Sequence, residues 1–249
     1  MSSHSNSDQT QPRILRTFTT LHHLRSSWDG QIILSLGLNP EGAALSIAAN
    51  IAGAVSLAID NKPTHLREVV RSGAADFVVN TLNEAIRAMK NEVRKRAPLS
   101  IALNTDPFLT LTEIQDRGLA PQLFSAFLSP TDLHPEQANA LAHAAHQFQT
   151  EGAFLIDFTD QSPSALFTSS NELLPPLLAA RNWTLQTYTF DTVATLRSFD
   201  ARALALLAAE NPQDTLRRRW LEAAPRILQR QRPPQRTLWL TSDEAARLL

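Results

Sequence analysis

Short apolar runs alternate with helix-like segments over residues 31–103, and this alternation most limits the fold that the chain can adopt. The apolar runs are residues 31–36, 54–59, 75–79 and 99–103. Helical spacing or a helix-ending glycine marks the segments between them, which are residues 43–52, 63–72 and 81–96. Strands that alternate with helices become parallel neighbours joined by right-handed crossovers. We therefore predict an α/β fold, a Rossmann-like parallel sheet with flanking helices.

The rest of the chain divides into a short tail and a C-terminal part. Residues 1–12 are rich in Ser, Asn and Gln, and we expect a disordered tail there. A Rossmann domain is expected over residues 13–160, beginning with a helix at 14–28. We expect a mainly helical C-terminal extension, residues 161–249, that packs on this domain. Further helices are predicted at residues 112–117, 135–150, 200–210 and 214–228, and further strands at residues 153–158 and 237–240.

Composition excludes several classes of function. The chain of 249 residues has no cysteine, which rules out disulfides, thiolate nucleophiles and cysteine-ligated zinc. Its formal net charge of −1 favours no polyanionic partner over the whole surface, and we expect no nucleic-acid partner. No apolar run approaches the roughly 20 residues that span a bilayer. The N-terminus lacks the basic and apolar regions of a signal peptide. We expect a cytoplasmic protein without a membrane segment.

The loop after the first strand is the best candidate for a binding site. It runs from Gly37 to Gly42 and leads into a helix, whose free N–H groups suit a phosphate. Asp60 ends the next strand. Its separation from Gly37 along the sequence is the one expected for an acid that accepts a ribose hydroxyl. However, Pro40 lacks an N–H and Glu41 adds a negative charge. The residues alone are equally compatible with a loop that holds no ligand.

These residues resemble the central NAD-binding domain of urocanase (urocanate hydratase). In that family a glycine-rich loop leads into an Ala-rich helix, a strand ending in an acid, and an Asp-Leu-Asp-Glu-Ala helix. The corresponding segments here are residues 37–54, Asp60, residues 81–85, residues 100–103 and the Arg117-Gly118-Leu-Ala-Pro121 step. The C-terminus also resembles the family, in Trp220-Leu221, Gln231, Pro234, Arg236, Trp239-Leu240 and Glu244.

The resemblance implies a cofactor and a substrate site. It implies NAD held by Gly37, Asn39, Gly42 and Asp60, and a substrate contacted by Gln231 and Arg236. In urocanases the NAD⁺ acts as an electrophile during hydration of urocanate, a step of histidine degradation. The chain departs from the family where an Asp-Gln-Thr cluster is replaced by Ala126, Phe127 and Leu128. Apolar side chains cannot move protons, so we expect the catalytic residues to be lost.

Two other residue clusters could each be a binding site or a set of side chains without a binding role. His143 and His146 share a helix face, as two metal ligands would, but no third ligand is placed beside them, so we expect no metal site. An arginine cluster could bind nucleic acid or an acidic protein; its members are Arg217, Arg218, Arg219, Arg226, Arg230, Arg232 and Arg236. We favour a solvated helix face and basic loop, neutralised by Glu210, Asp214 and Glu222.

Three hypotheses follow for the function. The favoured one is a divergent, non-catalytic urocanase-family protein that binds a small molecule or a protein. The second is an active, NAD-dependent lyase of the urocanate hydratase type, with carbon–oxygen lyase chemistry on urocanate or a related imidazole. The third is a chain that works as a homodimer or paired with a second urocanase-like polypeptide that supplies missing parts.

Overall fold

A parallel seven-stranded sheet forms the larger part of the molecule. The computed structural model describes residues 10–128, 133–159, 165–207, 211, 214–227 and 233–248. The strands follow the order β3-β4-β2-β1-β5-β6-β7 and all neighbours are parallel. Their bounds are β1 (Ile32–Leu36), β2 (Val55–Ile59), β3 (Phe77–Val79), β4 (Leu99–Leu103), β5 (Leu123–Ala126), β6 (Phe154–Asp157) and β7 (Thr168–Ser169). The predicted Rossmann-like α/β fold is confirmed.

Helices cover both faces of this sheet, as short crossovers between parallel strands require. One apolar cluster joins α2 (Pro40–Ala52) and α3 (Pro63–Ser72) to one face. The opposite face packs against α4 (Leu82–Lys95), α5 (Pro107–Asp116) and α6 (Pro135–Thr150). The central strand β2 is buried along its whole length, which explains its continuous apolar sequence.

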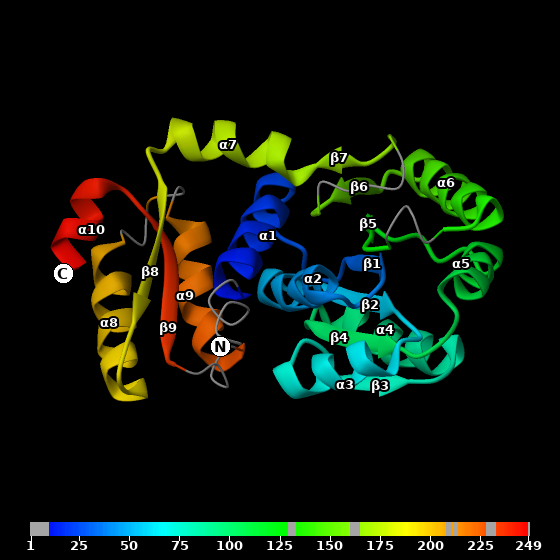
Figure 1. Cartoon of the computed structure of the whole chain (residues 1–249), viewed down its shortest axis with the longest axis horizontal. Helices are drawn as coiled ribbons and strands as arrows, with labels where there is room; N and C mark the ends of the chain where they lie inside the picture. The colour runs from blue at the N-terminus through cyan, green and yellow to red at the C-terminus, as the bar shows by residue number, and fades with distance from the viewer. Residues whose placement is uncertain are drawn as a thin grey trace, which may run out of the picture.

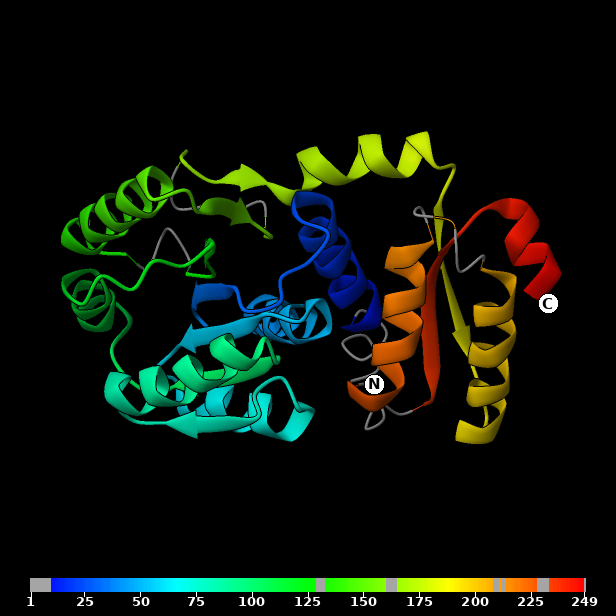
Figure 2. The same cartoon turned by 180° about the vertical axis from the view of Figure 1, so that it is seen from behind.

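The C-terminal part is built around a two-stranded antiparallel sheet. Helix α7 (Ser170–Ala180) leads from β7 to β8 (Thr184–Thr189), and β8 pairs with β9 (Gln235–Leu240). Figures 1 and 2 show α7 running along one side of the molecule between the large sheet and this smaller one. The helices around the small sheet are α8 (Val193–Leu206), α9 (Thr215–Ile227) and α10 (Ser242–Leu248). This part is mainly helical, as predicted.

Helix α1 (Thr10–Leu24) joins the two parts. It packs along α2 and also contacts β9, α7 and α9, and Figure 1 shows it standing between the two sheets. The side-chain amide of Gln11 donates to the carbonyl of Gln235 at 2.7 Å and accepts from the N–H of Thr237 at 3.0 Å. The indole of Trp239 donates to the hydroxyl of Thr19 at 2.8 Å. The first helix is therefore part of the core.

Several elements differ from the sequence-based prediction. Helix α1 begins at Thr10, so the last three residues of the predicted tail 1–12 are helical. Helix α5 begins at Pro107, because Asp106 caps it by accepting from the N–H groups of Phe108 and Leu109. Strand β7, for which the sequence analysis predicted no strand, also belongs to the large sheet. No helix of the described residues is long and apolar enough to cross a membrane.

Candidate binding cavity at the switch point of the sheet

The sheet reverses its strand order at β1. The chain leaves β1 towards β2 on one side and later returns to β5 on the other, which makes the carboxyl ends of β1 and β5 a topological switch point. A cavity of about 440 Å³ opens there. Its lining comes from α1, from the loops after β1, β5 and β6, and from the start of α7: Pro12, Arg13, Arg16, Thr17, Asn39, Glu41, Phe127, Leu128, Phe158, Thr159, Ser170 and Asn171. This size suits a small organic ligand.

Two aromatic rings lie at the strand-loop side of the cavity. Phe127 follows β5 and Phe158 follows β6, so adjacent parallel strands deliver them to the same edge of the sheet. Their ring centroids are 6.4 Å apart with an interplanar angle of 23°. The Phe127 carbonyl accepts from the Asn39 amide at 3.3 Å, which ties the β5 loop to the β1 loop. These rings give the cavity a flat apolar surface.

Two arginines reach the cavity from α1. Arg13 forms an ion pair with Glu41, with 3.3 Å between Nε and Oε1. Arg16 donates from Nη2 to the side-chain oxygen of Asn171 at 2.6 Å. No carboxylate of the described residues lies within ion-pair distance of Arg16. The cavity therefore carries one cation that no described acid neutralises, which favours an anionic ligand.

The loop after β1 uses most of its own hydrogen-bond donors. Gly37 donates its N–H to the Ile59 carbonyl at 2.8 Å, and Gly42 donates to the Asn39 side chain at 2.9 Å. Pro40, the first residue of α2, has no N–H to offer. A Cβ at Gly42 would lie 2.2 Å from the Gly37 carbonyl oxygen, so this glycine makes room for the loop itself. The loop as folded does not form the several-donor cradle that a pyrophosphate requires.

Asp60 fastens this loop to the second strand. Its buried carboxylate accepts from the Leu38 N–H at 2.6 Å and from the Lys62 N–H at 2.7 Å. The Nδ1 atom of His65 lies 2.7 Å from the same carboxylate. A ribose hydroxyl would have to compete with these three partners. The cluster predicted from sequence, Gly37, Asn39, Gly42 and Asp60, is thus brought together, and Asn39 also lines the cavity.

The predicted substrate residue Arg236 lies elsewhere. Arg236 is in β9, where it is 1% exposed and pairs bidentately with Asp200 at 2.7 and 2.9 Å. It does not line the cavity. Gln231 lies outside the described residues. The structure therefore does not bring Arg236 to the predicted cofactor residues.

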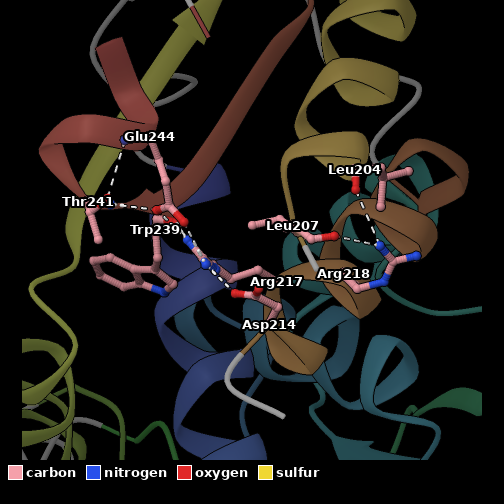
Figure 3. Close-up of polar contacts among 8 residues, drawn as sticks. All are labelled: Leu204, Leu207, Asp214, Arg217, Arg218, Trp239, Thr241 and Glu244. Atoms are coloured by element: carbon pink, nitrogen blue, oxygen red, sulfur yellow. Dashed lines mark hydrogen bonds and ion pairs between the residues drawn. The ribbon is translucent and has the colours of Figure 1, made fainter. Parts of the chain in front are cut away.

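In the arginine cluster of the C-terminal part, the described side chains bond to groups of the fold, which corrects the interpretation as a solvated face for Arg217, Arg218, Arg219 and Arg236. The side chains of Arg226, Arg230 and Arg232 lie outside the described residues. Arg217 is buried, bonds to both Asp214 and Glu244, and lies 4.7 Å from the ring centre of Trp183. Figure 3 shows Arg217 between its two acids and Arg218 pointing to the carbonyls of Leu204 and Leu207. These contacts explain why Arg217 and Arg218 follow one another, because each satisfies groups inside the fold.

The ion pair of Arg217 also changes the protonation of its partner. Burial alone would raise the pKa of Glu244, but hydrogen bonds from Arg217 and from the Thr241 N–H, with the arginine charge, lower the pKa below the ordinary value of 4.5. Burial likewise opposes the charge of Arg217, yet its two acids raise the pKa of the guanidinium. Arg217 and Glu244 therefore stay charged, and their ion pair ties α9 to α10.

Of the two histidines that share a helix face in the sequence, His143 contacts a neighbouring helix. His143 lies 3.2 Å from the Gln115 amide nitrogen, joining α6 to α5. Within the described ranges, no group of three or more His, Cys, Asp or Glu side chains is arranged to hold a metal ion. Sequence reasoning missed Arg13, Arg16 and the α7 residues of the cavity, although the spacing of three places the two arginines on one face of the helix.

These features define a class: a Rossmann-like α/β protein with a small-ligand cavity at the switch point of its sheet. The family model of the urocanase Rossmann-like domain matches residues 14–156. That match covers more than half of the 249 residues, and the chain belongs to the urocanase family. The resemblance noted in the sequence is confirmed for this region. The matched segment starts within α1 and ends in β6, so both α1 and the switch point belong to it.

Proposed function

We propose that this protein is a non-catalytic member of the urocanase family that binds a small organic anion in the switch-point cavity. The observation that carries the proposal is the pairing of Arg16, a cation without a described acid partner, with the stacked rings of Phe127 and Phe158 in one cavity. A carboxylate would bond to the guanidinium, and a flat apolar body would lie against the rings.

The chemistry of the lining supports binding without catalysis. General acid–base catalysis needs a side chain that can exchange a proton at the reacting atom. The described lining contains no histidine, and its single carboxylate, Glu41, is paired with Arg13. The remaining polar groups are hydroxyls, amides and arginines, which bind and orient a ligand. The loop of residues 37–42 adds support, because the N–H groups of Gly37, Leu38 and Gly42 are used within the fold.

The competing function is that of an NAD-dependent lyase of the urocanate hydratase type. It is favoured by membership of the family and by the Gly37, Asn39, Gly42 and Asp60 cluster beside the cavity. Bound NAD⁺ would supply an electrophile that this chain itself lacks. In that case the loop would have to open, since the N–H groups of Leu38 and Gly42 already have partners.

The NAD⁺ content of the purified protein and the change in its Tm on adding a ligand distinguish the two functions. The purified protein is denatured and the supernatant is analysed for NAD⁺ by mass spectrometry. The native protein is then melted with benzoate, urocanate or NAD⁺. We expect no stoichiometric NAD⁺, and we expect at least one of the two carboxylates to raise Tm, since a ligand that binds the folded state stabilises it.

A matched variant shows whether the cavity is responsible. Arg16→Ala should weaken carboxylate binding by about tenfold or more, the loss expected when one charge-assisted hydrogen bond is removed. Arg25→Ala, which removes an exposed arginine beyond the end of the same helix, is the control. Stoichiometric NAD⁺, or consumption of urocanate above the rate of the Arg16→Ala variant, would overturn the proposal in favour of the lyase.

A further inference from the structure

Helix α1 presents two faces to two different parts of the molecule. Pro12, Arg13, Arg16 and Thr17 line the cavity. Gln11, Phe18 and Thr19 contact β9 or α9. At 3.6 residues per turn, successive residues are about 100° apart, which places Gln11 and Phe18 on roughly the opposite side of the helix from Arg13 and Arg16, with Thr19 between the two sets. The same rigid element thus borders both the cavity and the C-terminal part.

The face towards the C-terminal part forms a specific seam. Besides the paired hydrogen bonds of Gln11 and the bond from Trp239 to Thr19, the ring of Phe18 stacks on Trp220 with centroids 6.2 Å apart. Gln11 is 1% exposed and Thr19 is fully buried. Buried hydrogen bonds of this kind have narrow geometric limits, so the seam is sensitive to small displacements of α1.

The face towards the cavity is held by fewer and more exposed contacts. Arg13 reaches Glu41 at the start of α2, with side chains 32% and 29% exposed. Arg16 reaches Asn171 at the start of α7. Both contacts span the cavity from α1 to other elements. A ligand that bonds to either arginine would therefore restrain α1 against α2 and α7.

We infer that α1 transmits occupancy of the cavity to its seam with β9, so that a filled cavity tightens the C-terminal part. The identity of the ligand rests on the proposed function. The coupling between the cavity and the seam does not depend on which ligand binds. Because coupling between two sites is reciprocal, loosening the seam must weaken ligand binding by the same factor.

A chemical tether tests the transmission without any ligand. The chain has no cysteine, so a double variant Arg16→Cys, Asn171→Cys reacts with a bismaleimide at these two positions alone. The tether fixes α1 to α7 across the cavity, as an occupying ligand would. We expect the backbone amides of β9 to exchange hydrogen about tenfold more slowly in the tethered protein than in the same variant left unreacted, within the usual range of allosteric coupling.

Two controls make the result specific. The same reagent on Glu68→Cys, Arg71→Cys staples an exposed turn of α3 and should leave exchange in β9 unchanged. Thr19→Ala removes one bond of the seam and should reduce the effect of the cavity tether on β9. Thr19→Val, which keeps the branched shape without the hydroxyl, replaces it if the alanine variant does not fold. Equal exchange in β9 with and without the cavity tether would overturn the inference.

The ligand arm separates this inference from the proposed function. If benzoate binds the wild type, Thr19→Ala should lower the affinity for benzoate. The fold-change in affinity should equal the fold-change by which benzoate slows hydrogen exchange in β9. If benzoate binds with no change in β9, and the tether has no effect, the transmission is wrong and the binding function stands. If neither benzoate nor urocanate binds, the binding function fails, and the tether alone decides the transmission.

Discussion

Gln11 and Thr237 are 226 positions apart in the chain, yet the side-chain carbonyl of Gln11 accepts the N–H of Thr237 at 3.0 Å. The other end of the same amide donates to the carbonyl of Gln235. A single side chain thus pairs with the backbone of β9 in the way that a residue of a neighbouring strand would. The N-terminal helix and the last strand therefore depend on each other.

Replacing Gln11 by alanine should destabilise the whole chain. The change leaves the Thr237 N–H and the Gln235 carbonyl buried without this partner, and each such group costs roughly 1–3 kcal/mol. Urea unfolding should show the loss as a lower midpoint at unchanged slope. Gln149→Ala, at an exposed position at the end of α6, is the control and should stay within about 0.5 kcal/mol of the wild type. Equal midpoints for both variants would show that the Gln11 pairing adds no stability.

Arg236→Ala should unfold the protein more readily, whether or not ligand is present. The variant leaves the carboxylate of Asp200 buried without its bidentate partner, and breaking such a pair costs roughly 3–5 kcal/mol. Arg197→Ala removes an exposed arginine from the same helix as Asp200 and serves as the control. If Arg236→Ala kept the Tm of the wild type but lost ligand binding, Arg236 would be a substrate contact, as the family resemblance implies.

Stability should fall on mild acidification because of His22. Burial lowers its pKa below the ordinary 6.5, and the charges of Arg219 and Arg181 lower it further. The unfolded chain therefore binds the proton more readily, and the stabilising contribution is complete above about pH 6.5 and is lost as the pH falls towards the folded pKa. In urea titrations between pH 7.5 and 5.5 (about two units around the histidine pKa), His22→Gln should flatten the dependence. The exposed neighbour variant His23→Gln should leave it as in the wild type.

Gly42→Ala should distort the loop after β1. The added Cβ would lie 2.2 Å from the Gly37 carbonyl oxygen, which is backbone and cannot turn away as a side chain can. Overpacking of this kind costs roughly 1–3 kcal/mol. Ala43→Ser, at the next position of the same helical turn, is the control. It tests whether any substitution in this turn lowers the free energy of unfolding. A Gly42→Ala variant as stable as the wild type would mean that the loop is free to move, and would favour the competing NAD-binding function.

The sequence predicted the N-terminal half of the large sheet well because each strand there is a continuous apolar run between helices with clear ends. Residues 31–36 and 99–103 became β1 and β4 almost unchanged. It did not predict β5, which has four residues and lies next to β1 at the switch point. Its side chains are buried by α6, α5 and the neighbouring strands, and such contacts between distant segments leave little local periodicity.

The C-terminal part was harder to predict for two physical reasons. Helix α7 contains Pro175 and Pro176, which ordinarily argue against a helix. Strand β8 has partly exposed, mostly polar residues and is defined by its pairing with β9, whose first residue is 46 positions after the end of β8.

The lining of the cavity was also hard to predict from the sequence. Arg13 and Arg16 meet the strand-end loops only after α1 has packed on α2, so the sequence identified Asn39 as a site residue and missed both arginines of the lining.

The four residues predicted to hold NAD each have a structural role that does not involve a nucleotide. Gly37 adopts φ of 93°, Asn39 caps α2, Gly42 admits a carbonyl and Asp60 clamps the loop. Selection for a stable fold would preserve all four in a lineage that had stopped binding its cofactor. The fold alone therefore accounts for these four residues, and their presence in a sequence does not by itself indicate that a cofactor is bound.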